Sequence, residues 1–153
     1  MEDLSIKQGD KGLNIRTGAI IIKDGRMLLI WSPHGEHWYS VGGRVKFGES
    51  SIEAVRRELK EELGDFAERL TGGELVVVNE NFFQYGEHYV HEYGFYYLFD
   101  GSALPEAEEI PLGDCNGYLK YLTEEELKRE VVYPLFLKDG LKFDGVKHII
   151  IRE

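Results

Sequence analysis

The sequence predicts an α+β fold in which a mixed β-sheet is flanked by helices. Three observations lead to this prediction: two short apolar runs joined by an Asp-Gly pair, one amphipathic segment with helical spacing, and a long stretch rich in β-branched and aromatic residues. Strand-like and helix-like segments alternate irregularly along the chain, as expected for a sheet with helices packed against it.

A β-hairpin is predicted near the N-terminus. Residues 18–22 and 27–31 are apolar and rich in Ile and Leu, and the pair Asp24-Gly25 lies between them. Such a pair suits a tight turn because Gly accepts a positive φ without steric cost. A short strand-like stretch over residues 38–41 follows.

Residues 50–63 are predicted to form a helix. Ser50 and Glu53 are spaced as in a capping box, in which each side chain bonds to the backbone N–H of the other residue. Gly64 is a typical residue at the end of a helix. Four apolar residues recur at helical spacing and form one stripe: Ile52, Val55, Leu59 and Leu63.

Three further segments, at residues 74–79, 81–84 and 89–99, have the composition of strands. Alternate residues of a strand face the same side, so the aromatic residues at alternate positions of the last segment are expected in the core. These residues are Tyr93, Phe95, Tyr97 and Phe99.

The last third of the chain is expected to be less regular. Residues 101–116 contain two prolines and several acids and are predicted to be an exposed loop. Thr123 and Glu126 form a second capping-box pattern, which predicts a short helix. Residues 134–141 are predicted to form one or two helical turns, and residues 147–151 a final strand.

Composition and charge limit the classes of function. Hydrophobic residues make up 42% of the chain, enough for one domain with its own core over residues 1–153. The net charge is −10, from 18 basic and 28 acidic residues, which argues against binding to long nucleic acids. A small phosphorylated substrate is compatible with this charge if cations shield it.

The single cysteine, Cys115, allows no intramolecular disulfide and no zinc-thiolate site, and we expect a buried or inactive thiol. The first residues lack the pattern of a secretory signal. The longest apolar runs are too short to cross a bilayer, so no membrane association is expected. These features predict a soluble, cytoplasmic protein.

The most informative pattern spans residues 43–64. It begins with Gly43, continues after five residues with Glu49, and ends after seven more with Arg57-Glu58-Leu59-Lys60-Glu61-Glu62-Leu63-Gly64. This pattern resembles the Nudix box and matches all seven of its fixed positions. Average amino-acid usage puts a chance match below roughly one in 10⁷ per window. One position departs from the box, because Asp65 occupies its final apolar position and Phe66 comes next.

The resemblance extends beyond the box to residues 20–29, 80–83 and 147–152, which look like small bacterial, single-domain Nudix proteins. Only the box itself is specific. Val41 replaces the proline that usually precedes the paired glycines, a change that affects turn stiffness and no ligand. The resemblance implies a Nudix fold, an α/β/α sandwich in which the box forms a loop–helix–loop.

The spacing of the acids in the box has a physical meaning of its own. On a helical wheel, Glu58, Glu61 and Glu62 fall within about 100° of one another, beside the apolar stripe. Three like charges at this spacing repel one another, so the pattern favours a bound cation. Carboxylate ligands suit Mg²⁺ or Mn²⁺ and not Zn²⁺.

The resemblance also implies roles for these residues. Glu58 and Glu62 correspond to the metal-binding glutamates of the family, and Glu61 to a further ligand or to the base that activates water. The backbone carbonyl of Gly43 is expected to complete the metal shell.

Arg57 is expected to pair with Glu49 and to orient Glu58, a supporting task beside the metal ligands. The catalytic base varies within the family and can lie outside the box. Glu92 and Glu80, on the strand-like segments after the helix, are further candidates for it.

The function implied is Mg²⁺-dependent hydrolysis of the diphosphate linkage in a nucleoside diphosphate joined to another group. NTPs, ADP-ribose, dinucleoside polyphosphates, nucleotide sugars and capped RNA ends all remain open as substrates, and homodimers are common in the family. One alternative is a nucleotide-sensing module, which would be free to lose its carboxylates. Another is an isoprenoid-diphosphate isomerase, which would need a reactive cysteine in the site, whereas Cys115 is far from the box in sequence.

Other polar and aromatic residues have simpler interpretations. His88 and His91 differ by three positions and therefore face opposite sides of a strand, which makes them a poor metal pair. Phe82, Phe83 and Tyr85 lie near a predicted loop, where they either pack or contact a nucleobase.

Overall fold

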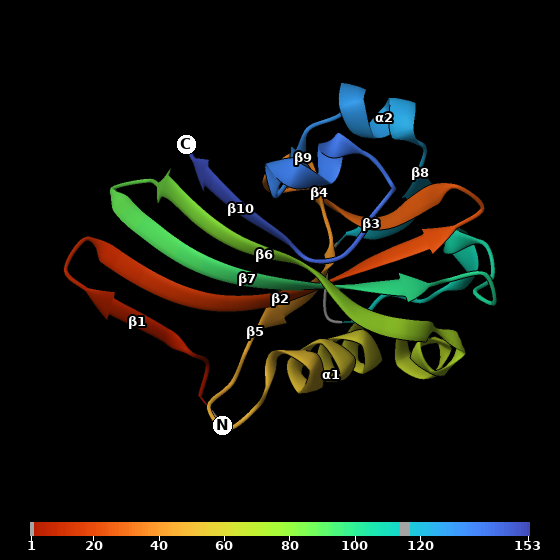
Figure 1. Cartoon of the computed structure of the whole chain (residues 1–153), viewed down its shortest axis with the longest axis horizontal. Helices are drawn as coiled ribbons and strands as arrows, with labels where there is room; N and C mark the ends of the chain where they lie inside the picture. The colour runs from red at the N-terminus through yellow and green to blue at the C-terminus, as the bar shows by residue number, and fades with distance from the viewer. Residues whose placement is uncertain (1, 114–116) are drawn as a thin grey trace.

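The computed structural model describes residues 2–113 and 117–153, and the described chain is built around one curled β-sheet (Figure 1). Cys115 lies outside the described residues. The strands are β1 (Ser5–Gln8), β2 (Lys11–Lys23), β3 (Arg26–Ser32), β4 (His37–Tyr39), β5 (Val41–Arg44), β6 (Thr71–Tyr85), β7 (His88–Asp100), β8 (Tyr118–Leu122), β9 (Val132–Tyr133) and β10 (Lys147–Arg152). The α-helices are α1 (Ser51–Leu63) and α2 (Glu124–Arg129), and 3₁₀ helices form at Gly64–Arg69, Ala107–Glu109 and Leu135–Asp139.

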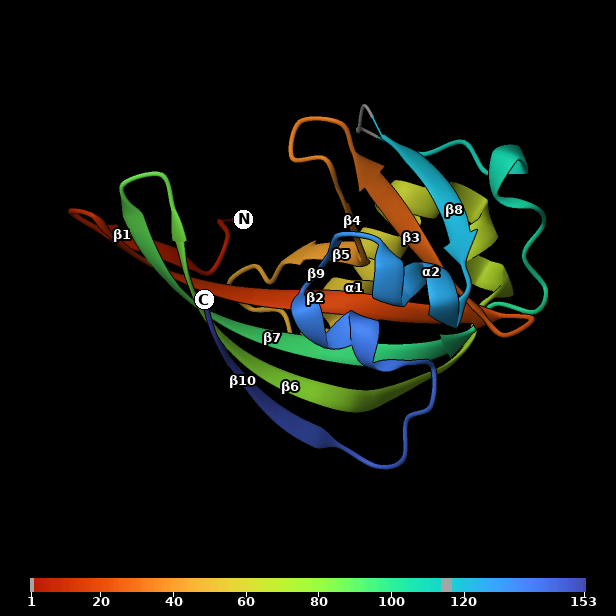
Figure 2. The ribbon, with the colours of Figure 1, turned by 90° about the horizontal axis from the view of Figure 1, so that it is seen from above.

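The sheet is mixed, as the sequence predicts. Its strand order is β10-β6-β7-β2-β3-β4-β9, while β1 and β5 also pair with β2, and β8 pairs with β3. The β2–β7, β6–β10 and β4–β9 pairs are parallel, and the other pairs are antiparallel. Seen from above, β2, β7, β6 and β10 lie side by side, and β3 and β8 turn away from them (Figure 2). The predicted α+β class with a mixed sheet is therefore confirmed.

The two faces of the sheet are covered by different helices, α1 below and α2 above in the view of Figure 1. On the α1 side, Val55, Leu59 and Leu63 pack in one buried cluster with Ile21 and Phe99. On the other side a second buried cluster includes Ile20, Leu29, Tyr96, Leu127 and Phe136. The strands of β2 and β3 are thus buried on both faces, which explains their continuous apolar runs.

The predicted turn and helix boundaries are confirmed. Asp24 and Gly25 adopt positive φ angles of 50° and 70° in the turn between β2 and β3. The side chain of Ser50 accepts a hydrogen bond from the backbone N–H of Glu53, and α1 ends at Gly64 with φ 61°. Phe66 packs against the core on the α1 side. The C-terminal end of α1 is therefore attached to the core, although Asp65 occupies the final apolar position of the box.

Three expectations need correction. Residues 74–79 and 81–84 belong to one strand, β6, and β2 begins already at Lys11. The segment 101–116 is not simply exposed, because Leu104, Ala107 and Ile110 are buried in the cluster on the α1 side. Only a short 3₁₀ helix, Ala107–Glu109, forms between the two prolines, and the apolar residues of this stretch cover one end of the core.

The remaining predicted elements are present. Thr123 and Glu126 form a capping box at the start of α2, a 3₁₀ helix lies within residues 134–141, and β10 forms the last strand. Trp38 is 4% exposed and packs in the core. Among the helices that the structure describes, none has the length and apolar character needed to cross a bilayer.

Replacing Ser50 with alanine is expected to lower the free energy of unfolding by about 1 kcal/mol, because the exposed N-cap side chain satisfies the backbone N–H of Glu53. Urea-induced unfolding measures the change. Ser50→Asp retains a capping oxygen and should stay close to the original stability. Equal losses in both variants would contradict a capping role.

Candidate active site

The geometry of the site starts from the contact between α1 and the sheet. Thr17 of β2 is fully buried, and its hydroxyl lies 3.0 Å from the carbonyl oxygen of Ser51 and 3.1 Å from that of Phe95. It thereby ties the first turn of α1 to β2 and β7. Thr17 also pairs with Gly43 of β5, so the start of the helix and the loop before it are held at one place on the sheet.

Arg57 is the centre of the ionic contacts at this place. Its Nε and Nη2 donate to the two carboxylate oxygens of Glu49 at 2.6 and 3.0 Å. Its Nη1 donates to Glu58 at 3.0 Å and to Glu61 at 3.3 Å, and its Nη2 also reaches the carbonyl of Arg44 at 3.1 Å. The expected pairing of Arg57 with Glu49 is therefore present, and the same guanidinium contacts Glu58.

The environment shifts two carboxylates in opposite directions. The hydrogen bond from Arg57 lowers the pKa of Glu49 from 4.5 to about 2, and the backbone N–H of Lys46 adds to this effect. Burial raises the pKa of Glu58, and the hydrogen bond from Arg57 opposes the rise. Arg57 therefore stabilises the ionised form of Glu49. Burial disfavours the ionised form of Glu58, and a further cation nearby would stabilise it.

Gly43 lies directly against the carboxylate of Glu58. A Cβ atom placed on Gly43 would be 2.3 Å from Oε1 of Glu58, far inside the contact distance. Only glycine allows the strand backbone and the carboxylate to approach this closely. The carboxylate of Glu58 is thereby held against the backbone of Gly43, and carboxylate and carbonyl oxygens are the ligand types that Mg²⁺ or Mn²⁺ prefers.

The acidic residues of α1 are not yet gathered into a complete ligand set. Within residues 2–113 and 117–153, no three Asp, Glu, His or Cys side chains are close enough to hold one metal ion. Glu58 and Glu61 instead converge on Arg57, and the side chain of Glu61 is 52% exposed. Glu62 lies on the same helix. The donor types and the Gly43 contact fit a divalent cation, and the metal site itself stays a prediction.

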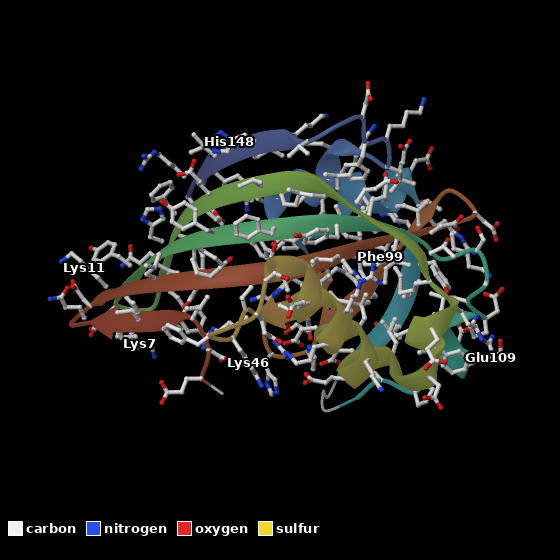
Figure 3. The ribbon with its side chains drawn as sticks, turned by 60° about the horizontal axis from the view of Figure 1, so that its bottom comes forward. Lys7, Lys11, Lys46, Phe99, Glu109 and His148 are labelled. Atoms are coloured by element: carbon white, nitrogen blue, oxygen red, sulfur yellow. The ribbon has the colours of Figure 1, made fainter. Side chains whose placement is uncertain are left out.

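The two other candidates for the base lie outside this cluster. Glu80 of β6 forms an ion pair with His148 of β10. Lys46 lies in the loop that leads into α1 and marks this end of the site, and His148 lies well apart from it (Figure 3). Glu92 of β7 lines a separate cavity on the sheet face opposite α1. The structure therefore brings neither residue to Glu58.

That cavity has a volume of about 740 Å³. Its lining includes Phe83 and Tyr85 from β6 and Tyr133 from β9, so two of the three aromatic residues left open by the sequence face it. Phe82 does not line it, and its ring stacks with His91 and lies under Arg152.

Arg16 connects the cavity with the acidic cluster and was missed by the sequence analysis. It lines the cavity, and its charge lowers the pKa of Glu58. Its backbone pairs with Arg44 of β5, next to Gly43. In the sequence, Arg16 stands out only as a basic residue next to an apolar strand. Its neighbours in the fold depend on the pairing of β2 with β5, which the sequence does not show.

Stability should depend on pH through Glu49. The pKa of Glu49 is lower in the folded protein than in the unfolded chain, so its contribution is fully present above pH 4.5 and is lost as the pH falls toward 2. In Glu49→Gln, the free energy of unfolding should fall less steeply over this range. Denaturant titrations over about 3 pH units, from roughly pH 5 to roughly pH 2, measure the slope.

The exposed residue Glu74 of β6 offers a matched control for this prediction. Glu74→Gln should keep the original pH dependence, because it removes the same charge away from Arg57. An unchanged slope in Glu49→Gln would contradict the assigned pair.

A curled mixed sheet with an acidic helix packed on one face, preceded by a glycine loop, is the architecture of a Nudix domain. The chain belongs to the Nudix family, since residues 12–137 match the model of the NUDIX domain. The match covers the box and the cavity strands β6 and β7, and it ends within the 3₁₀ helix at Leu135–Asp139.

Solved structures share this fold. The solution structure of the E. coli ORF135 protein is 25% identical, with a TM-score of 0.57, over 88% of this chain and 91% of that one. A mutator MutT protein from Bacillus halodurans is 20% identical, with a TM-score of 0.61, over 91% and 90% of the two chains. An ADP-ribose pyrophosphatase from Streptococcus suis is 15% identical, with a TM-score of 0.54, over 90% and 98%. No curated protein matches the chain.

Proposed function

We propose that the chain is a Mg²⁺-dependent pyrophosphohydrolase, with Mn²⁺ as an alternative ion, that cleaves the diphosphate linkage of a nucleoside diphosphate joined to another group. The observation that carries this proposal is the arrangement of Glu58. Its carboxylate is held by Arg57 against the backbone of Gly43, and Arg16, whose charge favours the ionised form of Glu58, lines a cavity of about 740 Å³. An acidic cluster, together with a cavity that is lined by one arginine and several aromatic rings, suits a substrate with a diphosphate and a ring system.

The residues divide the work by their positions. Glu58, Glu62 and the carbonyl oxygen of Gly43 would hold the metal, with Glu61 as a further ligand or as the acceptor of a proton from water. A bound divalent ion supplies charge neutralisation at the phosphates and lowers the pKa of water.

Arg57 and Arg16 have different tasks in this proposal. Arg57 is held by both oxygens of Glu49, so it fixes the position from which Glu58 acts. Arg16 makes no ion pair with a described residue and faces the cavity, where it is available to a phosphate oxygen. In the reaction, a bond forms between the oxygen of water and phosphorus, and the bridging P–O bond breaks. The products are a nucleoside monophosphate and the other phosphorylated group.

The test is a substrate panel with the purified chain. NTPs, ADP-ribose, dinucleoside polyphosphates and nucleotide sugars are incubated with Mg²⁺ or Mn²⁺, and the products are separated by chromatography. We expect at least one compound to yield a nucleoside monophosphate, with the activity lost in EDTA and restored by Mn²⁺. Binding of these compounds in calorimetry without any cleavage would refute the proposal and would favour a nucleotide-sensing module.

A further inference from the structure

The cavity on the sheet face opposite α1 has a polar part that the diphosphate chemistry does not use. Glu92 of β7 and Asn81 of β6 both line it. They are direct partners in the antiparallel β6–β7 pair, so their side chains point to the same face. Directly opposed Cβ atoms lie about 5 Å apart. A carboxylate and a carboxamide therefore stand side by side in the cavity.

Neither side chain is satisfied by the protein. Asn81 is only 7% exposed, and its Oδ1 is buried without a hydrogen-bond partner among the described residues. Glu92 forms no ion pair or side-chain hydrogen bond with any residue in the described part of the chain. A buried polar group without a partner is costly, so Asn81 is more stable when a ligand supplies a hydrogen bond to its Oδ1, and the partly buried Glu92 can accept hydrogen bonds from the same ligand.

The types of these groups restrict the ligand. A carboxylate only accepts hydrogen bonds and prefers two adjacent N–H donors, whereas a carboxamide both donates and accepts. Among the common nucleobases, guanine has an edge with two adjacent donors, N1–H and the 2-amino group, next to the acceptor O6. Adenine and cytosine place a ring-nitrogen acceptor where the carboxylate would need a donor. Uracil has a single donor between two carbonyl oxygens.

The rest of the cavity suits a base in this orientation. Phe83 lies two residues after Asn81 on the same face of β6, and Tyr133 of β9 also lines the cavity. Aromatic rings of this kind stack on nucleobases. Arg16 is displaced along the sheet from Glu92, since Asn14 pairs with Glu92 and Arg16 with Gly94. Two residues of a strand span about 7 Å. The phosphates would therefore extend from the base toward Arg16.

We infer that this cavity binds the base of the substrate and that Glu92 and Asn81 select guanine. Glu92 accepts hydrogen bonds from N1–H and from one hydrogen of the 2-amino group, and the unpartnered Oδ1 of Asn81 accepts the other hydrogen of that amino group. The hydrolysis of a guanine nucleotide rests on the proposed function, whereas the selective binding of guanine in the cavity does not. Glu92 is thereby a specificity-determining residue and not the base that activates water.

Kinetics with the four ribonucleoside triphosphates test the selection. Original protein should have a kcat/KM for GTP that exceeds those for ATP, CTP and UTP by about 10- to 100-fold, the discrimination typical of a good bidentate contact. Glu92→Gln should lose most of this preference, mainly by an increase in KM for GTP, while Glu92→Asp retains part of it. Glu74→Gln, with the same charge change on an exposed part of β6, should keep it. Equal kcat/KM values for all four nucleotides in the original protein would overturn the inference.

Binding measured without metal separates this inference from the proposed function. Calorimetry with GMP, AMP, CMP and UMP in EDTA requires no catalysis. We expect GMP to bind at least about 10-fold more tightly than the other three, and Glu92→Gln and Asn81→Leu to abolish the difference. Selective GMP binding in a chain that cleaves nothing would refute only the hydrolase. Cleavage of nucleotides together with unselective binding would refute only the guanine site.

Discussion

Glu58→Gln is expected to lower kcat by about 10²-fold or more while the fold stays intact. The carboxamide has the same shape as the carboxylate and can still accept the hydrogen bond from Nη1 of Arg57. It removes the negative charge beside Gly43, where the divalent ion is proposed to bind. Steady-state turnover of the best substrate from the panel, measured at saturating Mg²⁺, gives the size of the effect.

Two further measurements make this result specific. Urea-induced unfolding should show similar stability for Glu58→Gln and the original protein, and Mn²⁺ titration followed by electron paramagnetic resonance should show weaker binding. Glu68→Gln removes an exposed charge just after α1 and should leave turnover unchanged. If Glu58→Gln turns over substrate at a near-normal rate, Glu58 is not a metal ligand.

The parts of the structure that the sequence predicts correctly are governed by local interactions. The start of α1 follows from the Ser50–Glu53 spacing, and its end from Gly64, because capping involves residues within one helical turn. The Arg57–Glu49 pair also depends on a short stretch of chain, in which a helix follows a tight loop. These features needed no knowledge of the strand order.

The cavity depends instead on the pairing of distant strands. Arg16, Asn81, Glu92 and Tyr133 come from four strands, and only the pairing of β2, β6 and β7 and the position of β9 bring them together. Local patterns contain no information on strand order. For the same reason the sequence does not show on which face of the sheet Glu92 lies relative to α1.

The segment 101–116 shows a different limit. Its prolines and acids predict a loop correctly, but loop and exposure are separate properties. Leu104 and Ile110 are buried because the end of the α1-side core needs a cover that no helix or strand provides. Whether the side chains of a loop are exposed depends on the elements that the loop packs against, and the sequence of the loop does not identify these elements.

Gly43→Ala is expected to lower kcat by about 10²-fold with little loss of stability, because a displacement of about 1 Å in a catalytic group has effects of this size. The new methyl group would meet Oε1, Cδ and Oε2 of Glu58 at 2.3, 2.5 and 2.8 Å. These atoms are the flexible end of a side chain, so the carboxylate can move aside while the backbone stays in place. Turnover and urea-induced unfolding are measured on the same preparation.

The neighbouring glycine offers an internal contrast. A Cβ atom on Gly42 would lie 2.3 Å from the backbone oxygen of Thr17, and backbone in a paired strand cannot move aside as a side chain does. Gly42→Ala should therefore lower stability, whereas Gly43→Ala should lower turnover. Gly12→Ala has its nearest atom at 3.9 Å and should change neither. If Gly43→Ala is fully active, the close contact between Gly43 and Glu58 has no role in catalysis, and the metal site proposed on it must lie elsewhere.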